Sequence, residues 1–387
     1  MIVTHLQLTD FRNYSSLDLA LPTGSTLFVG SNGQGKTNLV EALGYLSTLG
    51  SHRVPSDQAM IRQGQDSAVV RSKLEHGERR LLVEVQLNRG SANRAQVNRS
   101  AVKPRELPRY FSSVLFAPED LALVRGEPSG RRRFLDELLV LRSPRMSGVL
   151  ADYDRVLKQR NTLLKSARAT GVKPEKLSTL EIWDERLIDL GAQIVHARSL
   201  LISELDPEVT AAYAAVAGAD HAAQLASSLS ILGDRDPDDE GPDDAATRAG
   251  VIDVAVAAQA FTASLARLRR SELDRGVTLA GPHRDDLVLT LNGMPARGYA
   301  SHGESWSFAL ALKLASAQVL RRESSIGDPV LILDDVFAEL DEARRGRLAE
   351  AVGDFEQVLI TAAVFDDVPE ALAANIVHIR AGEVIDG

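Results

Sequence analysis

Apolar and polar residues alternate along much of the first ninety positions. The side chains of Ile2, Leu6 and Leu8 share one parity, and three leucines in residues 17–21 do the same. A period of two predicts β-strands with one buried face. Further strands are expected at 26–29, 67–70 and 81–87, with one helix after Gly35. The chain therefore begins as a sheet-rich unit.

The middle of the chain follows a different period. From residue 131 to about residue 205 apolar positions step by three and four, which predicts long helices. The clearest set forms a seam of three heptads: Leu180, Trp183, Leu187, Leu190, Ile194, Ala197 and Leu201. Residues 170–174 (TGVKP) break the helical pattern. We interpret this stretch as two helices folded back on each other in an antiparallel hairpin, and ordinary core helices of a bundle are the alternative.

Strand patterns return after about residue 276. Residues 287–291 run into Asn292-Gly293, a dipeptide that favours a tight hairpin turn. A helix is expected at 304–322, followed by strands at 330–333 and 358–361 and a closing edge strand at 376–379. We therefore predict an α/β fold in which residues 1–130 and 271–387 form one domain and residues 131–270 form an inserted helical arm.

The charge of the chain is acidic overall but unevenly placed. Its 387 residues include 44 Lys and Arg and 53 Asp and Glu, a net charge of −9, which argues against a protein coated in positive charge. Residues 233–250 alone hold seven acids and two arginines, and this Pro- and Gly-rich tract predicts a flexible acidic loop without a site. The rest of the chain is close to neutral, so a local basic surface for nucleic acid stays open.

Several classes of protein are excluded or disfavoured by composition. The absence of cysteine excludes disulfides, thiolate metal sites and cysteine nucleophiles. We see neither a signal peptide at the N-terminus nor an apolar run long enough to span a bilayer. A cytoplasmic protein without a membrane partner is the expectation.

The first motif that carries chemistry follows the strand at 26–29. Residues 30–37 match the phosphate-binding pattern G-x-x-x-x-G-K-[ST] at every defined position, and a helical pattern follows. In such a loop backbone N–H groups and a helix N-terminus surround phosphates, the lysine reaches the β- and γ-phosphates, and the hydroxyl ligates Mg²⁺. The candidate ATP-binding residues are Gly30, Ser31, Asn32, Gly33, Gln34, Gly35, Lys36 and Thr37, with Lys36 as a catalytic residue and Thr37 as a metal ligand.

A second motif supplies acids at the end of an apolar strand. Leu331-Ile332-Leu333 is followed by Asp334 and Asp335. Beside a phosphate loop, Asp334 is expected to hold Mg²⁺ and Asp335 to orient or deprotonate the attacking water.

These motifs and their order resemble ABC-type ATPases. The segment VFAELD (336–341) after the acidic pair is similar to their loop at a dimer interface, and the long insertion resembles the branch that includes chromosome-maintenance (SMC) proteins and the RecF family. The RecF family is favoured by FRNY (11–14), LFAPED (115–120), RRRFLD (131–136) and GPHRDD (281–286). The resemblance covers roughly residues 1–140 and 275–387.

The resemblance implies further nucleotide contacts. Arg12, Asn13 and Asn38 would lie near ATP, and residues 301–304 (SHGE) occupy the place of the ABC signature. There Ser301 and Gly303 would contact the γ-phosphate held by the opposite subunit. Glu304 departs from the family, which usually has Gln. Thr361 stands where transporter ATPases carry a switch histidine, and this implies slow hydrolysis.

The resemblance also implies a function. It predicts ATP-driven homodimerisation on double-stranded DNA near single-strand gaps, slow DNA-stimulated ATP hydrolysis, help in loading the recombinase RecA, and RecR as a protein partner. The alternative is an ABC-type ATPase subunit of another system, coupled to a transporter or to a chromosome-organising scaffold. The inserted arm disfavours the first and its short length disfavours the second.

Two other sets of residues are less specific. His283 beside Asp285 and Asp286 could suggest a metal site, but no second histidine lies at ligand spacing, so we expect a structural role. Four arginine clusters are candidates for DNA contact, although each taken singly is more typical of a solvated helix face, and the resemblance implies that some of them carry DNA: 131–133, 267–270, 321–322 and 344–347.

Overall fold

The computed structural model describes residues 1–170, 178–218, 221–233, 248–324 and 326–385. Two predictions from the sequence lie largely outside these residues, namely the helix breaker at 170–174 and the acidic loop at 233–250. The chain divides into two compact units, one of residues 1–125, 208–221 and 300–387 and the other of residues 126–207 and 222–299. The predicted α/β fold is confirmed.

The first unit contains two six-stranded sheets. The antiparallel sheet has the order β2-β1-β4-β5-β6-β7. The second sheet has the order β16-β15-β3-β14-β13-β8, and its strands are parallel except for β16. The strands of the first are β1 (Ile2–Phe11), β2 (Tyr14–Ala20), β4 (Ser67–His76), β5 (Arg79–Asn88), β6 (Arg94–Val97) and β7 (Ser100–Val102). Those of the second are β3 (Gly24–Val29), β8 (Ser113–Phe116), β13 (Val330–Asp334), β14 (Gln357–Ala362), β15 (Asn375–Arg380) and β16 (Glu383–Ile385).

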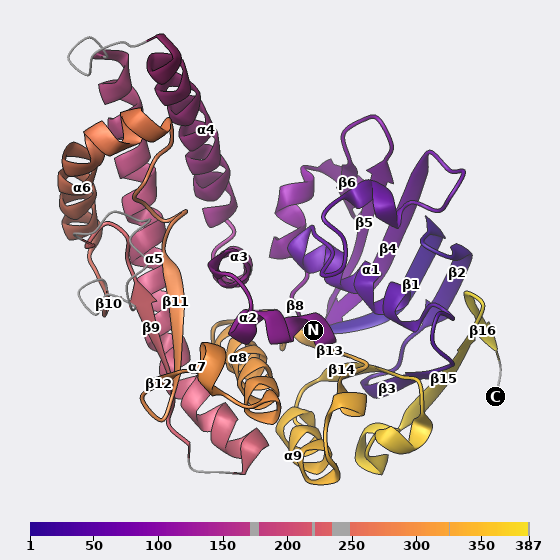
Figure 1. Cartoon of the computed structure of the whole chain (residues 1–387). Coiled ribbons are helices and arrows are strands. Elements are labelled where there is room, and N and C mark those ends of the chain that lie inside the picture. Colours follow the sequence, from indigo (N-terminus) through magenta and orange to yellow (C-terminus); the bar gives the residue numbers. More distant parts are fainter. Residues whose placement is uncertain (171–177, 219–220, 234–247, 325, 386–387) are drawn as a thin grey trace. The chain divides into compact units, whose positions relative to one another are not determined.

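Helix α1 (Lys36–Thr48) lies between these two sheets and contacts strands of both (Figure 1). Its apolar residues, such as Leu39 and Leu43, are fully buried with the inward residues of the antiparallel sheet in one core. Helices α8 (His302–Glu323) and α9 (Glu342–Val352) lie on the other side of the parallel sheet. The first unit is thus layered, and its two sheets share α1.

The remaining helices of the first unit are short. They are α2 (Leu121–Arg125), η1 (Asp57–Met60), η2 (Pro104–Arg109), η3 (Pro118–Asp120), η6 (Val336–Glu339), η7 (Phe365–Asp367) and η8 (Glu370–Leu372). The predicted edge strand at 376–379 is β15, but it lies between β3 and β16, so the expectation of an edge was wrong. The short β16 closes the sheet because the turn at Ala381-Gly382 returns the chain antiparallel to β15.

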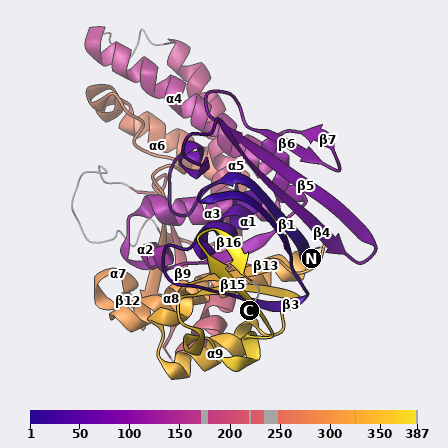
Figure 2. The same ribbon diagram turned by 90° about the vertical axis from the view of Figure 1, so that its right-hand side faces the viewer.

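The second unit is helical with a small sheet. Its helices are α3 (Pro128–Arg142), α4 (Met146–Thr170), most of α5 (Ser178–Ala217), α6 (Val254–Arg275) and the one-turn α7 (Ala296–Tyr299). Helices α4 and α5 run antiparallel, as Figure 2 also shows. Arg160 of α4 contacts Asp184 near the start of α5, whereas Tyr153, earlier in α4, packs near Gly191, later in α5. The residues of the heptad seam are buried or half-buried, so the seam is the inner face of α5.

Two features of this unit were missed in the sequence. Helix α6 packs with α4 and α5, and the fully buried Arg160 binds Asp184 of α5 and Glu272 of α6. A four-stranded sheet has the order β10-β9-β11-β12, formed by β9 (Ala223–Ser228), β10 (Arg248–Ala249), β11 (Asp286–Leu291) and β12 (Met294–Pro295). Because β11 pairs with β9, residues 271–299 group with the helical unit, whereas the sequence analysis had placed them in one domain with residues 1–130.

Candidate nucleotide-binding site

The loop of residues 30–37 joins β3 to α1. Gly35 forms the cap of α1 with φ 117°, a conformation that favours glycine. At Gly30 a Cβ atom would lie 2.2 Å from the carbonyl oxygen of Ile379 in the neighbouring strand β15. The motif glycines are therefore required by backbone shape and by close packing, and the loop opens at the N-terminus of a helix.

Lys36 turns back over this loop. Its side chain is buried, and its Nζ donates to the carbonyl oxygens of Gly30 at 2.6 Å and Ser31 at 3.3 Å. The ammonium group is thus held over the loop backbone, where a phosphate chain would meet both the positive charge and the first N–H groups of α1.

The loop is also held from the other end of the chain. The carbonyl of Gln34 accepts from Gly382 N at 2.9 Å, and Oε1 of Gln34 accepts from Ala381 N at 2.7 Å. These bonds join the loop to the β15–β16 turn. No motif in the sequence indicated this contact.

Asp334 ends β13 beside the loop. Its Oδ1 accepts from Thr37 Oγ1 at 3.0 Å and from Thr361 Oγ1 at 2.6 Å. The parallel register sets Asp334 opposite Thr361 of β14, so the sheet order brings together residues 297 positions apart. One carboxylate and one hydroxyl are the oxygen ligands that Mg²⁺ takes in sites completed by substrate phosphates and water. The donor set therefore fits Mg²⁺.

His52 is a neighbour of this site that the sequence did not reveal. Its Nε2 lies 3.7 Å from Asp334 Oδ2, and this buried nitrogen has no hydrogen-bond partner among the described residues. It follows α1 without any recognisable motif, so only the structure could place it near Asp334.

Asp335 adopts a left-handed conformation with φ 51°. Its backbone N–H donates to Thr361 Oγ1 at 3.0 Å, so one buried hydroxyl touches both acids. Burial, with the nearby charge of Asp334, raises the pKa of Asp335, and Lys36 opposes the shift. A raised pKa makes this carboxylate a stronger base than a solvated one.

Arg12 and Asn13 take different places near the loop. The Arg12 guanidinium forms a bidentate pair with the buried Glu41 of α1, at 2.8 and 2.6 Å. Asn13 donates to the carbonyl of Gln34 at 3.1 Å and accepts from Asn38 Nδ2 at 2.8 Å. Asn13 and Asn38 are therefore at the loop itself, while the Arg12 side chain is tied to α1 by Glu41.

The predicted signature residues meet a different set of side chains. Ser301 caps α8, accepting from Glu304 N at 3.3 Å while its own N–H donates to Glu304 Oε2 at 2.7 Å. These hydrogen bonds lower the pKa of Glu304. A Cβ on Gly303 would lie 2.9 Å from Arg344, whose side chain pairs with Asp341. The structure does not bring Ser301 and Gly303 to the loop at 30–37, because α8 and α1 cover opposite sides of the parallel sheet.

His283 has the structural surroundings expected for it. Its Nδ1 lies 2.8 Å from the hydroxyl of Tyr153, and burial lowers its pKa to about 4. In the part of the chain that the structure describes, no group of three or more His, Asp or Glu side chains is placed to hold a metal ion. The Asp334 site is consistent with this, since it offers a single carboxylate.

Comparisons with known proteins agree with the motifs. The family model described as RecF/RecN/SMC N terminal domain matches residues 2–381. A DNA replication and repair protein RecF of Clavibacter michiganensis is 68% identical and covers 100% of this chain and 96% of its own length. The RecF of Leifsonia xyli is 64% identical with 100% of each chain covered.

Solved structures give the same result. A structure of the recombination mediator protein RecF-ATP in the RecFOR pathway has a TM-score of 0.86 and 26% identity, covering 99% of this chain and 96% of that one. A structure of an Smc head bound to the C-terminal winged-helix domain of ScpA, at 14% identity and a TM-score of 0.52 over 100% and 97% of the two chains, shares the fold. No helix of the described residues is long and apolar enough to cross a membrane. By these matches and its own motifs, the chain belongs to the RecF family of DNA replication and repair proteins.

Proposed function

We propose that this chain binds ATP at residues 30–37 and uses it as a switch for assembly on DNA. The observation that carries the proposal is the hydrogen-bonded series Thr37, Asp334, Thr361 and Asp335, which joins the loop to both acids. A solved relative described as RecF-ATP, similar over 99% of this chain, supports ATP as the nucleotide.

Each residue of the loop has a role in this proposal. The backbone of Gly30, Ser31, Asn32, Gly33, Gln34 and Gly35 would surround the phosphates, with Asn13 and Asn38 beside it and Arg12 supporting α1. Lys36 would leave its carbonyl partners for the β- and γ-phosphates. Thr37 and Asp334 would hold Mg²⁺, which neutralises phosphate charge when bound. Asp335 would orient or deprotonate the attacking water, and its raised pKa suits that role.

The signature residues would serve the second subunit of a homodimer. Ser301 and Gly303 stand at the N-terminus of the 22-residue helix α8 and away from the loop of their own chain. A helix N-terminus favours an anion, so each could meet the γ-phosphate held by the other copy. Glu304 folds back on Ser301 and places its charge at its own helix cap. ATP would then stabilise the dimer by mass action, and hydrolysis would release it.

The cellular role follows from the family. The dimer would act on double-stranded DNA near single-strand gaps, hydrolyse ATP slowly with stimulation by DNA, and help load RecA with RecR as a partner. The head would be built from both ends of the chain, with the helical insertion as its arm.

Sedimentation of the purified protein with ATP, Mg²⁺ and gapped DNA tests this proposal. The unmutated protein should self-associate and retain DNA only with ATP, and Lys36→Ala should do neither. Asp335→Asn should bind ATP but persist as a nucleotide-bound dimer. If ATP promotes neither association nor DNA retention in the unmutated protein, the proposed ATP switch is wrong. Unaltered ATP turnover in Asp335→Asn would show that Asp335 does not activate the attacking water.

A further inference from the structure

The arginine clusters that stand out in the sequence are engaged within the protein. Each of the four has at least one member in an ion pair with a nearby acid: Arg131 with Asp286, Arg269 with Asp184, Arg322 with Glu208 and Arg345 with Asp367. Their N···O distances lie between 2.7 and 2.9 Å. An arginine already paired in this way offers less net charge to a phosphate, so these clusters carry less free positive charge than the sequence suggests.

Positive charge in the first unit is concentrated in one segment. Residues 62–109 contain eleven Lys and Arg against five Asp and Glu, a net charge of +6 in a chain of net charge −9. Residues 300–387, which supply most of the other sheet and its helices, contain seven Lys and Arg against sixteen acids, a net charge of −9. The antiparallel sheet is therefore the cationic part of this unit.

Strand alternation divides the side chains of this sheet between two faces. Residues such as Val70 and Val83 point into the core with α1. The alternate positions point outward, and the ladder places four of them in one row across the sheet: Gln7, Arg71, Glu84 and Gln96. This outer face is polar, and strands β4, β5 and β6 carry most of it (Figure 2).

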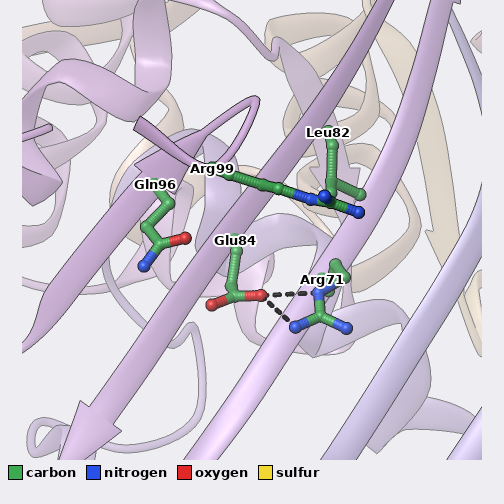
Figure 3. A pocket seen from close by; sticks show the side chains of 5 residues that line it. All are labelled: Arg71, Leu82, Glu84, Gln96 and Arg99. Carbon is green, nitrogen blue, oxygen red and sulfur yellow. Dashed lines mark hydrogen bonds and ion pairs between the residues drawn. The ribbon is translucent and has the colours of Figure 1, made fainter. Parts of the chain in front are cut away.

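A shallow pocket lies on the outer face. It is lined by Arg71, Leu82, Glu84, Gln96 and Arg99, and Figure 3 shows Arg71 joined to Glu84 while Arg99 extends across the neighbouring strands. The Arg71 Nε donates to Glu84 at 2.5 Å. The acid of the pocket is thus neutralised by one arginine, and Arg99 adds a net positive charge.

Three cations of the outer face have no acidic partner among the residues that the structure describes. Lys73 of β4, Arg94 of β6 and Arg99 of the β6–β7 turn are exposed, and none of the described residues forms an ion pair or side-chain hydrogen bond with them. Strands lie about 4.8 Å apart and rise about 3.3 Å per residue, so Lys73 and Arg94 are separated by about 16 Å. That span covers several phosphates of a DNA duplex, which carries one charge per about 1.7 Å of axis.

We propose that the outer face of β4, β5 and β6 docks the phosphate backbone of double-stranded DNA through Lys73, Arg94 and Arg99. The inference rests on the proposed DNA function and assigns a surface to it. Residues 62–109 contain no Phe, Tyr or Trp. Single-strand binding without sequence preference depends on aromatic side chains that stack on bases, so this face suits a duplex backbone. Contacts of this kind position DNA without reading its sequence.

A triple variant, Lys73→Gln with Arg94→Gln and Arg99→Gln, tests the surface. Fluorescence anisotropy with a labelled 30-base-pair duplex and ATP would be measured from 50 to 200 mM salt. Each lost phosphate contact lowers the slope of log Kd against log salt by about 0.9, so the slope should fall by about 2 to 3, with affinity at least about tenfold weaker at 50 mM salt. An unchanged slope and affinity overturn the proposal.

A control triple removes the same charge from exposed arginines of the second unit that are already paired: Arg133→Gln, Arg155→Gln and Arg186→Gln. It should leave the slope within about 1 of the unmutated protein. An equal loss in the control would mean that total charge, and not this face, governs binding. Retained binding of a fluorescent ATP analogue by both triples shows that they fold.

A variant of opposite sign sharpens the test. Glu84→Gln frees Arg71, whose side chain is 43% exposed, so duplex binding should tighten and the salt slope should steepen by up to about 0.9. Weaker binding in Glu84→Gln contradicts the proposal. If the unmutated protein binds no duplex, the DNA function itself fails, whereas normal binding by both the unmutated protein and the first triple removes only this surface.

Discussion

Two pairs of consecutive aspartates lie at strand ends in the described part of the chain, and their surroundings differ. Asp334 ends β13 and Asp335 follows it in the first unit, whereas Asp285 precedes β11 and Asp286 begins it in the second. Asp286 forms a bidentate pair with Arg131 at 2.7 Å, and Asp285 Oδ1 accepts two hydrogen bonds from Ser230. Among the described residues, Asp334 accepts hydrogen bonds only from two threonine hydroxyls, with His52 Nε2 at 3.7 Å, and the Asp335 carboxylate forms no hydrogen bond or ion pair.

The two pairs differ in how far the protein balances their charge. In the second unit the charge of Asp286 is cancelled by a buried arginine, and Asp285 is buried with a pKa raised to about 6 by desolvation. In the first unit neither acid is paired with an arginine: Lys36 acts on Asp335 without a hydrogen bond, and His52 Nε2 lies 3.7 Å from Asp334. A carboxylate whose charge is not balanced by the protein is the better candidate for a metal site.

The largest effect on activity is expected for Asp334→Asn. Asp334 is the proposed Mg²⁺ ligand, and loss of such a carboxylate removes several kcal/mol of transition-state stabilisation, so Mg²⁺-dependent ATP hydrolysis should fall by about a thousandfold. Phosphate release under single-turnover conditions measures it. The matched change in the other pair, Asp286→Asn, should leave the rate per folded molecule unaltered, and a rate loss there would contradict the division of roles.

For stability the order of the two variants is reversed, so Asp286→Asn should cost more than Asp334→Asn. Asp286→Asn leaves Arg131, which is 4% exposed, without its carboxylate, and the free energy of unfolding should fall by about 3 kcal/mol. Urea titration followed by circular dichroism measures the change. Asp334→Asn should lower stability by less than about 1 kcal/mol, because no buried arginine depends on this carboxylate. Equal losses would show that both pairs are structural.

Unfolding as a function of pH tests the buried environment of Asp285. Its raised pKa means that the folded state holds an extra proton between about pH 4 and 6, so this group lowers stability as pH rises. His283, with a pKa lowered to about 4, acts in the opposite direction between about pH 4 and 6.5. The two effects nearly cancel.

Single substitutions should therefore separate the two contributions to the pH dependence of the free energy of unfolding. In Asp285→Asn the free energy of unfolding should rise by about 2 kcal/mol from pH 4 to 6.5, and in His283→Asn it should fall by a similar amount. Thermal unfolding in a pH series measures both. Parallel curves for the two variants would contradict the assigned pKa shifts.

The smallest effect is expected at Thr361, which links the acids of the first pair. Thr361→Val removes the donor to Asp334 and the acceptor for Asp335 N, so hydrolysis should fall by about tenfold with ATP affinity little changed. Thr361→Ser keeps the hydroxyl and should restore most of the rate. If the valine variant turns over normally, Thr361 only packs in the sheet.

Much of the nucleotide site could be predicted because its signals are local. The loop at 30–37 is one contiguous pattern, and the strand before Asp334 is a short apolar run. The contacts of Gln34 with residues 381–382 and of Asp334 with His52 carry no pattern of their own, because each depends on two distant segments meeting across a fold. The same holds for β9, whose pairing with β11 joins segments separated by α6.

The sequence alone determined the chemistry of the phosphate loop, the α/β class, the long helices and the resemblance to the RecF family, because these depend on neighbouring residues and on short periods. Only the tertiary structure decided which charges are balanced. The arginines at 131–133 and 344–347 were candidates for DNA in the sequence, yet folding pairs Arg131 and Arg345 with acids and leaves Lys73, Arg94 and Arg99 exposed. Net charge at a surface depends on distances of a few ångströms between segments that are far apart in the chain, which composition cannot supply.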